Sequence, residues 1–243
     1  MKSPGRLKGE HRHMELGGFA MNLPSGLAWA LIAAFALSAC ANRPPPPEWQ
    51  MNAKGSTERA LEAYLTGNTR VEALEFARAR AEVARTGQPE LIARVELTRC
   101  AAHVASLVFD DCPGFVALAA DASPAERIYA SYLQGAALSP TEAALLPEQH
   151  RVVATSSSPA EALAGIDDPL ARLVAAGALL RGGRAQPAVI ASAAATASSQ
   201  GWSRPLLAWL GVQAKRAADA GDADEAARLR RRMDLVAGKS LAN

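Results

Sequence analysis

The sequence predicts an all-α protein: an array of helical hairpins, either solenoid-like or an irregular bundle, that follows an N-terminal targeting segment and a proline-rich spacer. Three observations predict it. Hydrophobic residues make up 49% of the chain but aromatic residues only 5%, and alanine alone accounts for more than a fifth of it. Alanine has the highest helix propensity, and its small side chain lets helices approach closely. Helix-start signals recur along the chain, whereas the alternating β-branched pattern of a β-sandwich does not.

The charge distribution argues against a nucleic-acid partner. The chain carries 26 basic and 24 acidic residues. Four of the basic and two of the acidic residues lie within residues 1–39, so the remainder is neutral. A neutral domain of mixed charge lacks the basic patch that nucleic-acid binding requires. We therefore expect no nucleic-acid partner.

The first distinct element is an apolar run of about eleven residues, Leu27 to Leu37. A helix needs about 20 apolar residues to span a bilayer, so this run is too short for a transmembrane segment. It fits the hydrophobic region of a signal peptide. We therefore expect residues 1–39 to be a signal peptide. A misassigned start within residues 1–20 is an alternative, because the basic residues that follow Met1 lie unusually far upstream of the apolar run. A start at Met21 would leave no Lys or Arg before that run, and a start at Met14 would give a weakly charged leader.

The apolar run leads into Leu37-Ser38-Ala39-Cys40, which resembles the lipobox of bacterial lipoproteins: an aliphatic residue, two small residues and a cysteine. The resemblance implies that Cys40 receives the lipid and becomes the first residue of the mature protein, so that the membrane is a partner through this N-terminal lipid. Several acyl chains would make that anchoring stable. By the sorting rule of enteric lipoproteins, Ala41 rather than Asp after the cysteine implies the outer membrane, facing the periplasm. The inner membrane is the alternative.

Four prolines, Pro44 to Pro47, follow the lipobox and cannot continue a helix. They predict a stiff polyproline II spacer between anchor and domain. We expect the linker to cover residues 40–55, the helical domain residues 56–238 and a C-terminal tail residues 239–243.

Two cysteines remain after Cys40, namely Cys100 and Cys112. In an exported protein such a pair is first interpreted as a disulfide. The two sulfurs can meet if the helix ends soon after Ser106 and the chain folds back along it. Free buried thiols are the alternative. We expect no metal site, because there is no Cys-x-x-Cys spacing and the mature chain has only His103 and His150.

Helix starts are recognisable by a repeated signature. Ser123, Ser139 and Ser158 each begin a Ser-Pro-x-Glu motif. The serine can cap the third helical amide, proline suits the first helical position, and the glutamate can accept from the serine amide. Asp168-Pro169 and Ser203-Arg204-Pro205 suggest further starts, and glycines such as those at 182–183 suggest ends. We predict helices near 56–66, 70–86, 89–108, 124–135, 140–146, 159–164, 169–181, 186–199, 204–220 and 222–237.

Two predicted hairpins resemble tetratricopeptide repeats. The first runs from Ala63 to Phe76 through Gly67-Asn68, and the last centres on Gly221-Asp222, followed by Glu225-Ala226-Ala227. In that family a small turn joins two helices, and alanine lets them close on each other. The full 34-residue consensus is satisfied nowhere. A repeat-like solenoid and a non-repetitive bundle therefore both remain open.

Tyr64, Trp202 and Trp209 are the candidates for an interaction surface, because they could line a groove that holds a peptide. Packing in the core is the preferred interpretation of these rings. His150 lies in a segment rich in turn signals near Ser156 to Ser158, but no Gly-x-Ser-x-Gly or His-Glu-x-x-His motif accompanies it.

We therefore expect no catalytic residues, no cofactor and no enzyme activity. The expected function is that of a lipid-anchored, non-enzymatic scaffold that binds another envelope protein. A structural or regulatory envelope lipoprotein with a closed bundle and no groove is the alternative. An enzyme whose site is assembled from scattered residues is a third class.

Overall fold

The computed structural model describes residues 45–238, and within them it contains twelve helices and no strand. The expected all-α array of helical hairpins is confirmed. The helices are α2 (Glu48–Leu65), α3 (Thr69–Ala84), α4 (Pro89–Ala105), α5 (Pro113–Val116), α6 (Pro124–Leu133), α7 (Pro140–Ala143), α8 (Glu148–Thr155), α9 (Pro159–Ala164), α10 (Pro169–Arg181), α11 (Pro187–Ser199), α12 (Ser203–Asp219) and α13 (Ala223–Val236).

The predicted capping boxes form at two of the three Ser-Pro-x-Glu motifs. Ser123 and Ser139 each accept a bond from the glutamate amide three residues on, and each glutamate accepts from the serine amide. At the third motif Ser158 has φ −114° and ψ 70°, and its side chain makes no capping bond. Asp168 caps α10 by accepting from the Ala171 amide, as its position before Pro169 predicts.

Apart from shifts of up to three residues at other helix ends, one helix start and two additional helices differ from the prediction. Helix α2 begins at Glu48, so the expected linker 40–55 ends within a helix, because Gly55 is tolerated inside α2 at a cost of about 1 kcal/mol. Helix α5 was not predicted. Helix α8 occupies the segment around His150 that we expected to be a turn, since its N-cap is Pro147, which offers no side-chain acceptor.

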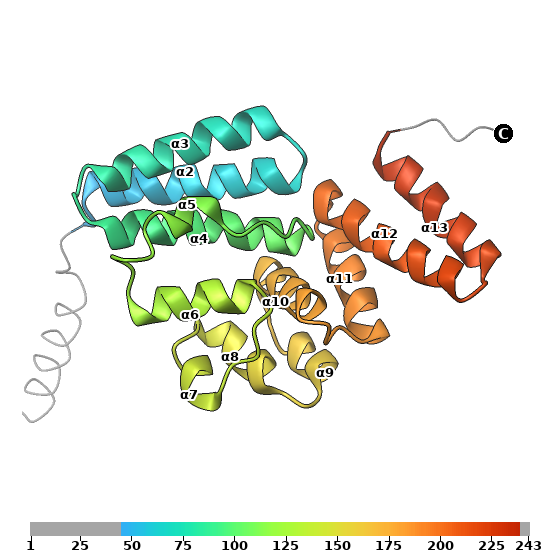
Figure 1. Ribbon diagram of the computed structural model, residues 1–243. Helices are drawn as coiled ribbons and strands as arrows, with labels where there is room; N and C mark the ends of the chain where they lie inside the picture. The colour runs from blue at the N-terminus through green and yellow to red at the C-terminus, as the bar shows by residue number, and fades with distance from the viewer. Residues whose placement is uncertain (1–44, 239–243) are drawn as a thin grey trace, which may run out of the picture. The chain divides into compact units, whose positions relative to one another are not determined.

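The helices are arranged around α4 and α10, which pack against each other (Figure 1). Helices α2 and α3 form the first hairpin and cover one side of α4. The short helices α6 to α9 lie on the other side, and α10 to α13 continue as a series of neighbours that ends in the hairpin α12–α13. Helix α12 also contacts α2, so the first and last hairpins lie close to each other.

The core around α10 is almost entirely apolar and closely packed. Leu173, Leu179 and their alanine neighbours on α10 are at most 1% exposed. Gly177 lies against Val104 of α4 so closely that a Cβ at this position would overlap the Val104 carbonyl oxygen. The crossing of α4 and α10 therefore requires glycine at 177.

The helices α2, α3, α4 and α6 are joined by buried glutamates that pair with half-exposed arginines on neighbouring helices. Arg59 on α2 donates to Glu75 on α3 at 3.0 Å. The corresponding bonds to the other buried glutamates are Arg99 to Glu72 (2.9 Å), Arg80 to Glu96 (2.6 Å) and Arg94 to Glu126 (2.6 Å). Each glutamate side chain is at most 8% exposed, so these carboxylates depend on their arginine partners for compensation.

Candidate functional site: the disulfide corner of α4

Tyr64 and Trp209 do not lie on an open surface. Trp209 is completely buried, and its indole N–H donates to the carbonyl of Ala105 at 3.0 Å, which satisfies an otherwise unpaired carbonyl at the end of α4. The Tyr64 ring stacks on His103 with centroids 4.9 Å apart and lies under the guanidinium of Arg204 at 4.4 Å.

Trp202 is half-buried at the N-cap of α12. It packs against the main apolar core, which contains Trp209, and against the small cluster that contains Tyr64. Of the three candidates for an interaction surface, Tyr64 and Trp209 thus follow the preferred interpretation as packing residues. Tyr64 and Trp209 are packing residues between α12 and the helices α2 and α4, and only Trp202 retains substantial exposure.

A different group of side chains gathers where α4 ends. The helix ends at Ala105, Leu107 takes a left-handed conformation with φ 59°, and the Val108 amide donates to the His103 carbonyl at 2.9 Å. This turn sends residues 108–112 back along α4. The return ends at Cys112, which is also left-handed with φ 51° and caps α5.

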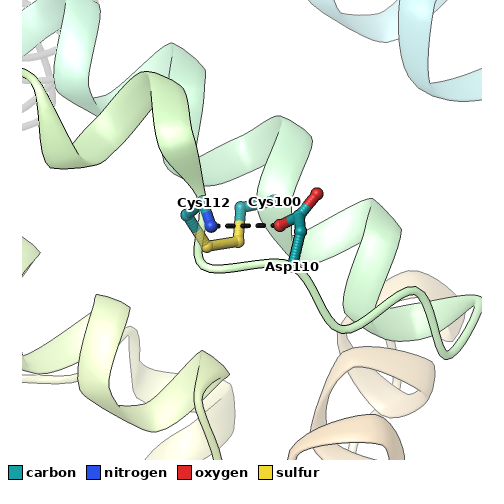
Figure 2. A group of neighbouring side chains, drawn as sticks. All are labelled: Cys100, Asp110 and Cys112. Atoms are coloured by element: carbon teal, nitrogen blue, oxygen red, sulfur yellow. Dashed lines mark hydrogen bonds between the residues drawn. A yellow bond between two sulfur atoms is a disulfide. The ribbon is translucent and has the colours of Figure 1, made fainter.

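The returning chain brings Cys112 to Cys100, and the two form a disulfide with their Cα atoms 5.5 Å apart (Figure 2). The expected pairing is confirmed. Helix α4 ends at Ala105, next to Ser106, where the pairing requires the helix to end. Both cysteines are 4% exposed. The disulfide joins α4 to α5 and fixes the loop between them.

Asp110 lies beside the disulfide and makes two side-chain hydrogen bonds. One carboxylate oxygen accepts from the Cys112 amide at 3.0 Å, as Figure 2 shows, and the other lies 2.9 Å from Nδ1 of His103. Burial on its own raises the pKa of Asp110, but the bonds from His103 and the Cys112 amide outweigh it and hold the pKa below its ordinary value. Asp110 is therefore a carboxylate.

Arg181 at the end of α10 holds this loop from 71 residues away. Its guanidinium donates to the Asp110 carbonyl at 2.9 Å and to the Asp111 carboxylate at 3.3 Å, and it lies 5.5 Å from the centre of the Phe109 ring. The loop position therefore depends on the packing of α10 against α4.

A small polar cavity of about 50 Å³ opens beside the disulfide. Its polar lining comes from Glu96, Arg99, His103 and Asp110, together with the two cysteines. Cys100, Cys112, His103 and Asp110 form what we call the disulfide corner. It thus combines two sulfur atoms, an imidazole and a carboxylate around one small cavity. These groups could act in thiol–disulfide exchange, or bind a cation once the disulfide is reduced.

The sequence contained a signal for this grouping. Cys100 and His103 are three residues apart on one helix, which places them on one face. Asp110 and Cys112 are two residues apart on the segment that returns along this helix. We predicted the cysteine pair but missed the role of His103 and Asp110, because a sequence does not show the path of a loop.

The other histidine of the helical domain lies in an apolar environment. His150 on α8 is 2% exposed and is stacked with Tyr129, with its Nδ1 3.5 Å from the hydroxyl of Tyr132. Burial lowers the pKa of His150 to about 4, and a weaker attraction from Asp168 opposes that shift. His150 is therefore a neutral packing residue at ordinary pH.

The last hairpin carries an open groove of about 320 Å³ between α11, α12 and α13. Arg216, Arg228 and Arg232 line it together with Glu225, which binds the Arg228 guanidinium with two bonds of 2.6 Å. The groove therefore has a basic lining on an apolar floor that includes Ile190 and Leu229.

Cys40 lies outside the described residues, as do the expected signal peptide and the lipobox-like tetrapeptide Leu37-Ser38-Ala39-Cys40. Among residues 45–238 no helix combines the length and hydrophobicity needed to cross a membrane. The chain matches no model of a known protein family. Comparisons with curated proteins and with solved structures likewise give no significant match.

Proposed function

We propose that this chain is a lipoprotein of the bacterial cell envelope whose helical array serves as a non-enzymatic interaction scaffold facing the periplasm. The observation that carries the proposal is the lipobox at Leu37-Ser38-Ala39-Cys40, directly after an apolar run of signal-peptide length. Lipid on Cys40 would tether the domain, and Pro44 to Pro47 would hold it away from the membrane.

The disulfide supports export. Cys100 and Cys112 are paired, and disulfides persist in oxidising compartments such as the periplasm but are rare in the cytosol. The pairing is therefore what an envelope location predicts for the only two cysteines of the mature chain besides Cys40.

The helical array supports the scaffold role. Stacked hairpins expose continuous helix surfaces that suit protein binding. The groove between α11, α12 and α13 is a hollow on such a surface, and three arginines line it.

The alternative function is that of a structural or regulatory lipoprotein without a binding groove. The burial of Tyr64 and Trp209 favours it, because two of the three aromatic residues that could have anchored a partner fill the interior instead. In this alternative the domain would act by its position in the envelope.

The anchor is tested by expressing the full chain and its Cys40→Ser variant in a bacterial host. We expect the wild type to stay in carbonate-washed membranes and its mature N-terminal peptide to carry diacylglycerol on Cys40. The Cys40→Ser variant should be neither lipidated nor cleaved at this position. A Cys100→Ser/Cys112→Ser variant is the matched control and should still be lipidated. Wild-type protein without lipid on Cys40 would overturn the anchor.

The scaffold role is tested by crosslinking in intact cells, with wild type, unanchored Cys40→Ala and an Arg216→Glu/Arg232→Glu variant. We expect the wild type to crosslink to a defined envelope protein that both variants lose. If the charge reversal keeps the crosslink, the groove is not the binding surface. If the wild type captures nothing beyond the unanchored form, the alternative function is favoured.

A further inference from the structure

We propose that Cys100, His103, Asp110 and Cys112 form a zinc site when the Cys100–Cys112 disulfide is reduced, so that this corner has a metal-binding dithiol state and a metal-free disulfide state. The proposal concerns the folded domain alone. It is therefore independent of whether Cys40 carries a lipid.

The donor atoms are already close together. The two sulfurs and a carboxylate oxygen of Asp110 all lie within 4.8 Å of one another. His103 lies outside this set, but its Nδ1 is 2.9 Å from Oδ2 of Asp110, so its ring would have to turn toward the sulfurs to become the fourth ligand. Thiolate, imidazole and carboxylate are the three ligand types that zinc takes in proteins, and four such ligands complete its tetrahedral shell.

The backbone holds these four residues in place without the disulfide. Cys100 and His103 are fixed on one face of α4. Asp110 is held by Arg181 on its carbonyl and by the Cys112 amide on its side chain. That amide bond resembles the second-shell contacts that orient ligands in metal sites.

The sulfur–sulfur and His103–Asp110 distances need only small changes, while His103 has to approach the sulfurs. Zn–S bonds of about 2.3 Å in a tetrahedral site put two sulfurs roughly 3.8 Å apart, which rotation about the Cα–Cβ bonds can give once the S–S bond opens. Ligand bonds of about 2.1 Å put a nitrogen and an oxygen roughly 3.4 Å apart. The His103–Asp110 contact is 2.9 Å, so it would widen by about half an ångström as the zinc ion replaces the proton between them.

Charge and space also suit a cation. Two thiolates and the Asp110 carboxylate would carry three negative charges around neutral His103, and Zn²⁺ would neutralise two of them. The cavity of about 50 Å³ beside the disulfide has a polar lining and can take the ion. Both cysteines are buried, so uncompensated thiolates would be costly there and zinc would stabilise them.

The conversion balances with a dithiol reductant, the chemical class used by thiol–disulfide oxidoreductases. The reductant gives two electrons and two protons to the S–S bond and becomes a disulfide, which leaves two thiols on Cys100 and Cys112. Zn²⁺ then replaces the two thiol protons, which pass to the solvent. Because each sulfur is used either in the S–S bond or in a Zn–S bond, oxidation releases the ion.

The test uses the full chain with Cys40→Ser, so that Cys100 and Cys112 are the only thiols. The protein is reduced with a phosphine under nitrogen. Zinc binding is measured by competition with a chromophoric chelator, and Co²⁺ serves as the spectroscopic probe. We expect one ion per chain in the reduced protein, with thiolate-to-cobalt charge-transfer bands and tetrahedral d–d bands, and no binding in the oxidised protein.

Substitution of single ligands distinguishes a built site from a pair of free thiols. His103→Gln and Asp110→Asn keep both cysteines, and each should weaken zinc binding by tenfold or more. Asp121→Asn is the matched control, because Asp121 is exposed and lies outside the loop that carries the proposed ligands, and it should bind zinc like the unsubstituted protein.

Two results would overturn the proposal. One is reduced protein that binds zinc no more tightly than a Cys100→Ser/Cys112→Ser variant. The other is that His103→Gln and Asp110→Asn both bind zinc as tightly as Asp121→Asn, since sulfur alone would then account for the affinity. Circular dichroism on every variant keeps loss of folding separate from loss of binding.

Discussion

Two regions of this domain are packed by different means. In the helices α2, α3, α4 and α6, four buried glutamates are each paired with an arginine of a neighbouring helix. Around α10, α11 and α12 the interior is built from alanine, leucine, valine and Trp209. Outside the main apolar core, to which α4 and α6 also contribute, the charged region has two small apolar clusters of four and three buried residues.

The difference shows how one chain can join helices in two ways. Buried carboxylates must find a specific partner, so the glutamate–arginine pairs define which helix faces lie together. Apolar contact is non-directional and gives most of the stability by area. We therefore expect the α10 region to be sensitive to side-chain volume, and the first region to be sensitive to loss of charge.

The largest expected effect comes from truncation of Trp209 in the apolar region. Trp209→Ala should lower the free energy of unfolding by about 4 kcal/mol, because it leaves a large cavity and removes the bond to the Ala105 carbonyl. Urea denaturation measures the change. Trp202→Ala, at a half-buried ring, is the matched control and should cost clearly less. Equal losses for the two variants would contradict the burial difference.

Acid titration separates the two regions in a second way. The folded-state pKa of His150 is about 4, below its ordinary value of 6.5, so the unfolded chain binds more protons between these values. The stability that neutral His150 contributes is complete above pH 6.5 and is lost as pH falls toward 4. The total loss is about 3 kcal/mol.

Glu126 responds at lower pH. Burial on its own raises the pKa of Glu126, but Arg94 and the Ser123 amide outweigh it and lower that pKa below its ordinary value of 4.5. Its contribution to stability is therefore present above pH 4.5 and is lost below it. The free energy of unfolding should be measured between pH 7 and 3.5. In His150→Leu its slope against pH should disappear above pH 4.5. An unchanged slope in this variant would contradict the assignment to His150.

The smallest expected effect compares two identical capping boxes. Glu126→Gln removes the charge that pairs with Arg94 and should cost about 1 to 3 kcal/mol. Glu142→Gln changes the same position of the exposed box at Ser139, which has no arginine partner in that box, and should change stability less. Thermal unfolding at low salt measures both. Equal effects would mean that the Arg94–Glu126 pair contributes nothing beyond the cap.

Much of the fold was predictable because helix starts and ends are local events. The capping boxes at Ser123 and Ser139 and the Asp168 cap of α10 each use groups within three residues of one another. Helix α8 was missed for the same reason, since it begins after Pro147 with no capping side chain. The Cys100–Cys112 pair was predictable because the loop is short and because the end of the preceding helix near Ser106 could be located.

The sequence by itself thus determined the helical class, predicted the two hairpins and favoured the cysteine pairing, and it carries the lipobox-like tetrapeptide at Cys40 on which the proposed anchor depends. Only the tertiary structure decided that Trp209 lies inside, that glutamates pair with arginines across helices, and that Arg181 holds the loop carrying Asp110. The physical reason is range. Hydrogen bonds within a few residues follow from the local sequence, whereas contacts between helices depend on how the whole array packs.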